Sequence, residues 1–533
     1  MAGTIGAFFE ARAAQWKAAD FLVVPSDPTR AYHPSGSIYS FAQASEIVMK
    51  WAACFENFGY GHGHRVAVLL ENRPEMLLLK LALASRGISW VPVNPDYRPA
   101  EIAYLLQDSD AVLAIVAPNV AALMRDGILE SGRDVPLVEM GVDLPDLPHA
   151  PGAAPVDGPV APESEASLIY TSGTTGRPKG CIISHDYEIQ MGKWYANLGG
   201  LVVFQEGKSR IYNPLPLFHV NGAILSFMCA IDQGCAQIIP ARFSGSRWWR
   251  EIVETRATVV HYLGIIIPAL MNRPPEEYDS KHKIEFAVGA GVEPTLHRAF
   301  EERFGFPLIE VWGMSEMCRL LADCHEPRAV DTRAIGRPQK GLDVRVVDEK
   351  NIEVARGTPG EMVIRYDANT PRKGAFSGYL NLPEATEEAW RGGWFHTGDT
   401  VRMDKTGLII FEDRKKNIIR RSGENIAAAE IEACLQEHPR VARVAVIAVP
   451  DTLRDEEVMA CVEVIDGCDD ALADELFDWS FKRLAYYKAP GWLRFLDEIP
   501  VTGTQKIQKH AMFGEGQNPT DGAYDFRDQK KRS

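Results

Sequence analysis

Residues 168–180, LIYTSGTTGRPKG, are the stretch of this 533-residue chain that decides its interpretation. A short apolar run, typical of a strand, leads into a loop with four hydroxyl side chains and three glycines that ends beside Lys179. Glycine lets backbone N–H groups approach a ligand closely, hydroxyls donate further hydrogen bonds, and the ammonium adds charge. The stretch therefore predicts a site for an anion such as a polyphosphate. An ordinary surface turn is the less favoured interpretation, because turns rarely need so many polar or glycine residues in succession.

The loop does not follow the Walker A pattern. That motif places Ser or Thr directly after its lysine, whereas Gly180 follows Lys179 here. An ordinary P-loop NTPase is therefore disfavoured.

Length and composition restrict the class of protein. A chain of 533 residues predicts two or more domains, one of them large. The 57 basic and 72 acidic residues give a net charge of −15, which offers no general attraction to nucleic acid or anionic lipid. No stretch approaches about 18 uninterrupted apolar residues, so we expect no membrane span. The nine cysteines are scattered without a CxxC pair, which favours a reducing, cytoplasmic location over a disulfide or zinc framework.

Short apolar strands alternate with helical patterns through the first part of the chain. Such alternation predicts parallel sheet covered by helices on both faces. The expected strands are residues 66–70, 90–93, 111–116, 210–213 and 237–240, with a surface linker at 145–162 and a helix at 247–256. From about residue 335 shorter β-like runs, including 344–348 and 361–365, indicate a more antiparallel section.

After Asp413 the pattern changes to a small α+β unit of about a hundred residues, a plausible domain size. Its expected elements are a helix at 427–437, strands at 441–449 and 458–465, and a helix at 471–484. Residues 514–533 are polar, and we expect them to form a frayed tail.

Four further segments follow the first loop in a fixed order. They are VWGMSE at 311–316, GWFHTGD at 393–399, DRKKNIIRRSGENI at 413–426 and PVTGTQKI at 500–507. From about residue 30 to 510 the chain resembles the adenylate-forming superfamily of acyl-CoA synthetases, peptide-synthetase adenylation domains and luciferases. The resemblance implies an α/β fold: a large N-terminal domain (1–413) of doubly wound sheets plus a distorted β-barrel, then a small mobile α+β lid (414–513) and a flexible tail (514–533).

The resemblance also assigns residues to ATP. The first loop would hold the phosphates through Thr171, Ser172, Gly173, Thr174, Thr175, Gly176 and Lys179. In the second segment Trp312 would lie against adenine beside Gly313, Ser315 would reach the α-phosphate, and Glu316 would contact Mg²⁺. Tryptophan and serine replace the more usual tyrosine and threonine, and both keep the chemistry because an indole stacks well and a serine still donates. Taken alone, Glu316 would more often be a surface acid.

Other positions are assigned to the rest of the nucleotide and to the hinge. Gly289, Ala290 and Gly291 would line the adenine and acyl pocket, unless they are merely a helix cap. Asp399 would accept hydrogen bonds from the ribose hydroxyls, as a carboxylate can, and Arg414 would also bind ribose. Lys416 would be the hinge of the lid, and a solvated charge run at this point is compatible with that role.

Lys506 is the residue that the resemblance implies for catalysis. A substrate carboxylate attacks the α-phosphorus of ATP, and an ammonium bridging the two anions offsets their repulsion. Losing such a group typically costs about 2.7–4 kcal/mol of barrier. The lid would then rotate so that Ser422, Gly423 and Glu424 line a coenzyme A tunnel, and a thiol would displace AMP.

The acyl pocket would include His219, Val220, Asn221 and Met314. His219 is interpreted either as a gate beside the reacting carboxylate or as a satisfied core histidine. Relatives that activate amino acids carry an aspartate where this chain has Val220. An α-ammonium there would be a buried unpaired charge, so we do not expect an α-amino acid substrate.

The acid is expected to be short, medium-chain or modified. Residues 243–249 and 451–456 look similar to crotonobetaine/carnitine CoA ligases, so a carnitine-like acid is one candidate. A quaternary ammonium would require an aromatic cage, for which Trp248, Trp249 and Trp312 are candidates.

The expected small molecules are ATP, Mg²⁺ and free coenzyme A, because no carrier-protein sequence follows the lid. A homodimer is considered as well. One alternative is an adenylating enzyme that uses a carrier protein or another acceptor, and a second is a catalytically silent binding relative. The presence of Lys506, Glu316 and Asp399 argues against the second.

Overall fold

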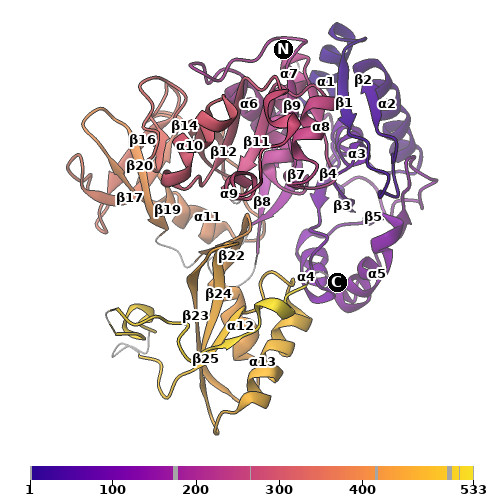
Figure 1. Cartoon of the computed structure of the whole chain (residues 1–533). Helices are drawn as coiled ribbons and strands as arrows, with labels where there is room; N and C mark the ends of the chain where they lie inside the picture. Colours follow the sequence, from indigo (N-terminus) through magenta and orange to yellow (C-terminus); the bar gives the residue numbers. More distant parts are fainter. Residues whose placement is uncertain are drawn as a thin grey trace.

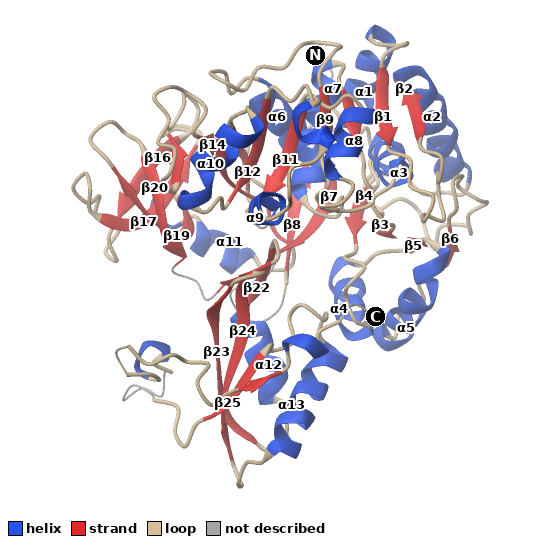
Figure 2. Cartoon of the chain, viewed as in Figure 1, coloured by secondary structure: helices blue, strands red, loops and turns tan. Residues whose placement is uncertain are grey.

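The computed structural model describes residues 3–171, 178–264, 266–414, 418–500, 507–514 and 516–531. In these residues the chain forms a large N-terminal body with three β-sheets and a smaller C-terminal body with one (Figures 1 and 2). The predicted α/β fold, with a large N-terminal part and a small α+β part, is confirmed.

The first sheet carries the strand that opens the 168–180 stretch. Its strand order is β18-β8-β7-β4-β3-β5-β6. Strands β7, β4, β3, β5 and β6 run parallel, β8 pairs antiparallel with β7, and β18 pairs antiparallel with β8. The strands are β3 (Arg65–Leu69), β4 (Ser89–Pro92), β5 (Leu113–Val116), β6 (Leu137–Glu139), β7 (Glu165–Thr171), β8 (Lys179–Ser184) and β18 (Gly378–Tyr379). The helices between them are α2 (Phe41–Asn57), α3 (Pro74–Ser85), α4 (Pro99–Ser109), η1 (Pro118–Val120) and α5 (Ala121–Ser131). The three strands predicted before residue 120 correspond to β3, β4 and β5.

The second sheet has eight strands in the order β14-β13-β12-β11-β9-β10-β1-β2. They are β1 (Asp20–Val24), β2 (Ser37–Ser40), β9 (Arg210–Tyr212), β10 (Ala236–Ile238), β11 (Val259–Leu263), β12 (Phe286–Ala290), β13 (Leu308–Met314) and β14 (Met317–Ala322). Its helices are α1 (Ile5–Gln15), α6 (His185–Ala196), η2 (Asn221–Leu225), α7 (Ser226–Gln233), α8 (Trp248–Glu254), α9 (Ile266–Met271), η3 (Glu277–Ser280) and α10 (Pro294–Phe304). Strands β13, β12, β11, β9, β10 and β1 are parallel, so their carboxyl ends share one edge.

The third sheet is antiparallel, as the shorter β-like runs predict. Its order is β15-β20-β19-β17-β16. The elements are β15 (Ala334–Gly336), β16 (Asp343–Val347), β17 (Pro359–Arg365), α11 (Pro383–Ala389), η4 (Arg391–Gly393), β19 (Phe395–Met403) and β20 (Ile409–Arg414).

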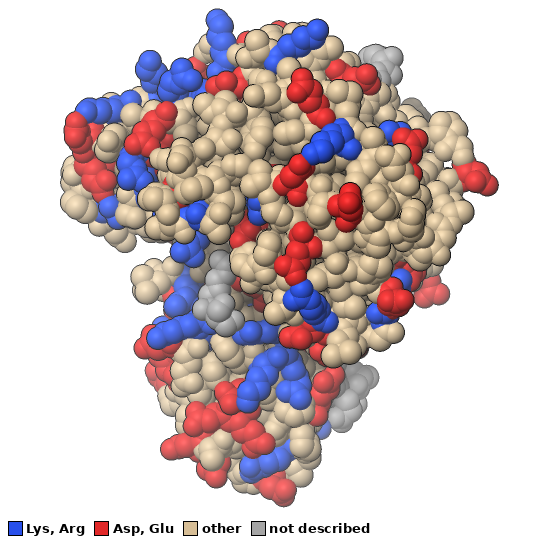
Figure 3. All heavy atoms as spheres, turned by 90° about the vertical axis from the view of Figure 1, so that its right-hand side faces the viewer, with Lys and Arg blue, Asp and Glu red and all other residues tan. Residues whose placement is uncertain are grey.

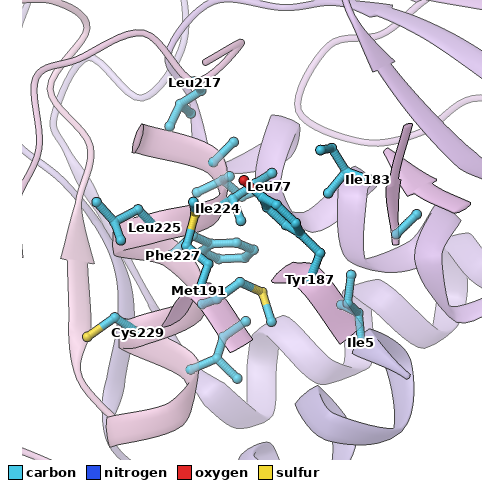
Figure 4. Close-up of a cluster of buried hydrophobic side chains, with 14 of the residues drawn as sticks. Ile5, Leu77, Ile183, Tyr187, Met191, Leu217, Ile224, Leu225, Phe227 and Cys229 are labelled. Carbon is cyan, nitrogen blue, oxygen red and sulfur yellow. The ribbon is translucent and has the colours of Figure 1, made fainter. Parts of the chain in front are cut away.

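Helices pack between the first two sheets and form the main core. Helix α3 is apolar on all sides, as expected for a helix enclosed in protein, and its one lysine, Lys80, is paired with Glu188 at 2.6 Å. Figure 4 shows Leu77 of α3, Tyr187 of α6 and Phe227 of α7 gathered in this core. The core therefore fixes the two sheets relative to each other, and with them the sheet edges that carry the motifs.

The smaller body is one sheet with two helices against it. Its strands are β21 (Ile418–Arg421), β22 (Glu424–Ala427), β23 (Val441–Asp451), β24 (Asp455–Val464), β25 (Trp492–Phe495) and β26 (Tyr524–Asp525). Its helices are α12 (Ala428–Gln436), α13 (Asp470–Arg483), η5 (Lys509–Ala511) and η6 (Arg527–Gln529). The predicted helices and strands of this unit are present with ends shifted by a few residues.

The expectation of a frayed tail does not hold for residues 516–531. Strand β26 pairs with β25, and Phe526 stacks on Phe477 with ring centroids 4.6 Å apart. Lys530 is buried beside the carboxylate of Glu457. The tail is mostly polar in composition, but one apolar contact and one buried ion pair hold the tail on the sheet.

No helix within the described ranges is long and apolar enough to cross a membrane.

Candidate functional site

The hairpin of β13 and β14 places the second motif against β19 of the third sheet. The indole Nε1 of Trp312 donates a hydrogen bond of 2.8 Å to Oδ2 of Asp399. Both residues are buried, with 5% and 3% of their surface exposed. Residues of two motifs that are 87 positions apart in the chain therefore lie side by side.

Tyr379 of β18 connects the 168–180 stretch with Glu316. Its hydroxyl donates a hydrogen bond of 2.7 Å to Oε1 of Glu316, and Nζ of Lys179 lies 5.0 Å from the centre of its ring. Burial and the neighbouring Glu316 carboxylate raise the pKa of Tyr379, so its hydroxyl remains a donor. Thr171 ends β7 opposite Lys179, which starts β8. Strand pairing thus brings Thr171 and Lys179 together, and Tyr379 joins Lys179 to Glu316.

Two positions at the end of β12 require glycine, for different reasons. A Cβ on Gly289 would lie 2.3 Å from the carbonyl oxygen of Tyr262, and Gly291 has a φ of +87°. The N–H of Gly291 donates to Oε2 of Glu310 at 2.9 Å, and the hydroxyl of Tyr262 donates to Oε1 at 2.7 Å. Burial raises the pKa of Glu310. A buried acid therefore fixes the turn 289–291, including Ala290, which is more than a helix cap requires.

A second buried acid holds the turn that precedes Asp399. Oε1 of Glu361 accepts a hydrogen bond of 3.1 Å from the N–H of Gly398, and Oε2 lies 3.3 Å from Nδ1 of His396. Burial raises the pKa of Glu361, but these contacts outweigh burial and lower it. Arg414 is the strand partner of Asp399 across β19 and β20, and its side chain lies outside the described atoms.

The carboxylate of Glu316 is placed to act as a ligand of Mg²⁺. Its Oε1 accepts from Tyr379, which leaves Oε2 for a cation. Mg²⁺ is commonly held by one or two carboxylates together with the phosphates of its substrate. Within the described parts of the chain no group of three or more His, Cys, Asp or Glu side chains could hold a metal. The arrangement fits a cation that arrives with a polyphosphate.

The loop between β21 and β22 reaches from the smaller body to the larger one. Oε2 of Glu424 lies 3.5 Å from Nε2 of His219, whose side chain is 42% exposed. Gly423 has a φ of +90°, and a Cβ there would lie 2.5 Å from Cδ1 of Leu263. His219 is therefore not a core histidine, and the positive φ favours glycine at position 423 of the loop. Ser422 precedes it with a φ of +52°.

Polar contacts join the two bodies around α4 and α12. Nζ of Lys488 lies 2.6 Å from Oε1 of Glu101 in the larger body and 2.7 Å from Oε1 of Glu430 in the smaller one. Burial lowers the pKa of Lys488, but the two carboxylates outweigh burial and raise it well above its usual value. Nδ2 of Asn94 also donates to the hydroxyl of Tyr487 at 3.0 Å. These contacts belong to the arrangement in which the loop 422–424 lies against His219.

The remaining expected residues divide into two groups. Val220 and Asn221 lie at the start of η2, Met314 and Gly313 lie in the β13–β14 hairpin, and the carbonyl of Ser315 accepts a hydrogen bond from Tyr187. Outside the described residues lie Ser172, Gly173, Thr174, Thr175 and Gly176 of the first loop, the hinge Lys416, and Lys506.

The proposed aromatic cage is not present at Trp248 and Trp249. Each is 2% exposed and packs in the core with residues such as Tyr212 and Phe304. Their indoles fill the core under α8 and are not available to a quaternary ammonium.

Four residues that build the site lie outside the sequence motifs. They are Tyr379, Glu310, Glu361 and Lys488. Each acts through a partner far away in the chain, so no local pattern marks it.

Comparison with protein-family models matches residues 9–380 to the AMP-binding enzyme family and residues 430–506 to the AMP-binding enzyme C-terminal domain. The chain belongs to the AMP-binding enzyme family. Among relatives of this AMP-binding enzyme is a sulfoacetate–CoA ligase of Cupriavidus necator, 31% identical, with 95% of this chain and 96% of the relative aligned. A crotonobetaine/carnitine–CoA ligase of Proteus mirabilis is 29% identical over 89% of this chain and 92% of its own.

Solved structures agree with the fold of this AMP-binding enzyme. An o-succinylbenzoate CoA synthetase from Bacillus subtilis superposes with a TM-score of 0.80 at 23% identity, covering 95% of this chain and 98% of its own. An amide bond synthetase from Marinactinospora thermotolerans superposes with a TM-score of 0.79 at 26% identity, covering 94% and 98%.

Proposed function

We propose that this AMP-binding enzyme is an AMP-forming acyl-CoA synthetase. It joins a carboxylic acid to ATP as an acyl-adenylate with release of pyrophosphate, and then transfers the acyl group to coenzyme A with release of AMP. The observation that carries the proposal is that the second sheet holds Trp312 against Asp399 at β13 and meets the lid loop 422–424 at Leu263 of β11. The CoA-ligase relatives support the same reaction.

Different residues of the site serve different parts of the adenylation step. The loop 171–179 receives the β- and γ-phosphates, Asp399 accepts from the ribose, and Trp312 lies against adenine. Mg²⁺ neutralises phosphate charge when it is bound, and Glu316 would hold it. Lys506 stabilises the charge that develops as the carboxylate attacks the α-phosphorus.

The docked loop serves the second step. With Glu424 beside His219, Gly423 would line the path of coenzyme A to the acyl carbon, where the lack of a side chain leaves room. Basic side chains gather around the junction of the two bodies on the face shown in Figure 3, which provides local charge for the phosphates of ATP and coenzyme A despite the net charge of −15. Rotation of the lid at Lys416 would exchange this loop for Lys506 between the steps.

The acid is a short, medium-chain or modified carboxylate without an α-ammonium. Val220 offers no charge partner for an ammonium, and the buried Trp248 and Trp249 offer no cage. A carnitine-like acid is therefore less favoured than the sequence alone suggested.

A panel of carboxylic acids, assayed for pyrophosphate and AMP with and without coenzyme A, tests the function. We expect carboxylate-dependent pyrophosphate release and thioester formation only with coenzyme A. If none of the acids in the panel supported pyrophosphate release, an enzyme of this type would be refuted. K506A is expected to lose adenylation, and retained adenylation would refute the role of Lys506.

The second candidate function is transfer of the acyl group to an acceptor other than coenzyme A. The similarity to an amide bond synthetase supports including amines in the panel. Amide formation without any requirement for coenzyme A would favour this reaction. The proposal also includes the use of Mg²⁺, which an assay without Mg²⁺ tests. It further includes a cytoplasmic location, tested by cell fractionation, and a homodimer, tested by sedimentation.

A further inference from the structure

A chain of hydrogen-bonded polar side chains lies behind the expected acyl site. Nδ2 of Asn213 lies 2.9 Å from Oδ1 of Asn221, which in turn lies 2.8 Å from Nδ1 of His261. Nε2 of His261 lies 2.9 Å from the hydroxyl of Tyr195. The chain draws on β11, α6, η2 and the residue after β9, and His261 and Tyr195 are completely buried. The adenylation and thioester steps assigned above do not use this chain.

Proton positions along the chain follow from one backbone donor. The N–H of Leu215 donates to Asn213 at 3.0 Å, so the atom that receives it must be the amide oxygen. The other end of the Asn213 amide is therefore NH₂, and it donates to Asn221. The facing atom of Asn221 is then its oxygen, which needs a donor at His261 Nδ1. With the proton on Nδ1, Nε2 accepts from the hydroxyl of Tyr195.

His261 is neutral in this arrangement. Burial lowers the pKa of His261 to about 3, in agreement with one proton on the ring. The side chains of Tyr195, Asn213, Asn221 and Ser226 carry no charge either. The network consequently fixes the orientation of Asn221 without placing a cation beside it.

The fixed orientation leaves the amide nitrogen of Asn221 available. Its oxygen accepts from both Asn213 and His261, whereas Nδ2 has no hydrogen-bond partner among the described residues and is not one of their buried unpaired atoms. The nitrogen is thus an accessible donor that cannot exchange places with the oxygen without breaking two hydrogen bonds.

Asn221 lies where an acyl group has to pass. It is two residues from His219, which contacts the docked loop at Glu424. It follows β9 and bonds to β11, at the carboxyl edge of the parallel strands, where ligands of open α/β sheets bind. Asn221 therefore lies near this edge, two residues from the side chain that contacts the loop 422–424.

We propose that Asn221 selects acids that carry an uncharged oxygen acceptor, such as an oxo or hydroxy group, near the reacting carboxylate. The inference rests on the proposed acyl-CoA synthetase function and names its substrate class. A plain alkyl acid leaves the oriented N–H unpaired once water is expelled, which is costly. A second anion, carboxylate or sulfonate, meets no counter-charge in the network.

Matched acids that differ in one oxygen test the proposal. Pyrophosphate release is measured with 4-oxopentanoate against 4-methylpentanoate, with 3-hydroxybutanoate against 3-methylbutanoate, and with butanedioate. The wild-type enzyme is expected to favour each oxygen-bearing acid by about tenfold or more in kcat/KM, and to use butanedioate less well than 4-oxopentanoate.

Two variants separate specificity from general damage. N221L removes the donor at similar volume, and the ratio of kcat/KM within each pair of acids should fall towards one, whatever the absolute rates. N221D replaces the donor by an acceptor, so 4-oxopentanoate should lose more than 3-hydroxybutanoate, whose hydroxyl can donate. Thermal unfolding and ATP binding of each variant check that it is folded.

Opposing results are clearly distinguishable. Equal rates within the pairs in the wild type, an equal loss for both members in N221L, or a preference for butanedioate would overturn the role of Asn221 alone. Absence of pyrophosphate release with every acid would contradict the proposed function and this inference with it.

Discussion

Trp312 holds one oxygen of Asp399 through its indole N–H, in addition to offering a face for adenine. W312F keeps an aromatic ring and removes this bond to a buried carboxylate. Hydrogen bonds to charged groups are worth about 1.5–3 kcal/mol, so we expect the KM for ATP to rise by roughly tenfold or more. The KM for the acid should not change. An unchanged KM for ATP would mean that Asp399 is oriented without Trp312.

Tyr379 offers a second single-atom change. Y379F removes the hydrogen bond to Glu316 and keeps the ring beside Lys179. We expect kcat for pyrophosphate release to fall by about tenfold, because the partner that orients Glu316 is lost, while the KM for coenzyme A stays constant. Y379L, which also loses the ring, should be worse. Equal activity of Y379F and the wild type would show that the bond has no part in the first step.

His261 should impose a pH dependence on stability. Its pKa falls from 6.5 to about 3 through burial, so between these values the unfolded chain binds a proton that the folded chain does not. Stability therefore rises with pH in this window, by up to about 1.4 kcal/mol per pH unit, and the gain is complete above pH 6.5.

Replacing His261 by glutamine should reduce the slope of that dependence, while His185, whose pKa burial also lowers to about 3, keeps its own contribution. Unfolding midpoints in urea are measured for the wild type, H261Q and the exposed-site control H149Q at pH 4.5, 5.5 and 6.5. The control should follow the wild type. A slope as steep in H261Q as in the wild type would contradict a neutral buried His261.

At the scale of elements, the C-terminal tail is part of the lid. Phe526 stacks on Phe477. Lys530 and Arg421 both contact the buried carboxylate of Glu457, and Arg421 directly precedes the loop 422–424. Truncating a buried phenylalanine typically costs about 3–5 kcal/mol, so F526A should destabilise the C-terminal domain by that amount. Hydrogen exchange in β24 and β25 reports the change, with F526L as the milder control. Exchange identical to the wild type would mean that the tail is not docked.

Elements with a strong pattern could be predicted from the sequence, and the tail shows where this fails. Strands such as β3 and β5 are buried on both faces, so their composition alone identifies them. The tail is mostly polar, and its order depends on Phe526 and on one ion pair with Glu457, contacts that no local window contains.

The site divides in the same way. Residues within motifs, such as Glu316 and Asp399, could be assigned through the resemblance. Tyr379 is 63 residues from the glutamate that it contacts, and His261 is 40 residues from Asn221. Only the folded chain brings such pairs together, so sequence patterns could not reveal them.

At the scale of the whole molecule, Lys488 couples the position of the lid to the larger body. E101Q weakens its contact with the larger body and leaves Glu430 as its partner within the lid. Breaking one side of a buried ion pair can cost about 3–5 kcal/mol, so the docked arrangement should become less populated. We expect thioester formation to slow by tenfold or more in single-turnover experiments, with the rate of pyrophosphate release unchanged. A matching loss in both steps would contradict a role for Lys488 in docking alone.

One chain is proposed to carry out both steps at the second sheet, which holds Trp312 against Asp399 and meets the lid loop 422–424 at Leu263. A single-turnover experiment with ATP, Mg²⁺ and an oxygen-bearing acid tests it most directly, with coenzyme A added only after the first phase. We expect pyrophosphate and enzyme-bound acyl-adenylate first, and AMP with acyl-CoA only after coenzyme A is added. Formation of ADP, or release of pyrophosphate that does not depend on the acid, would contradict it.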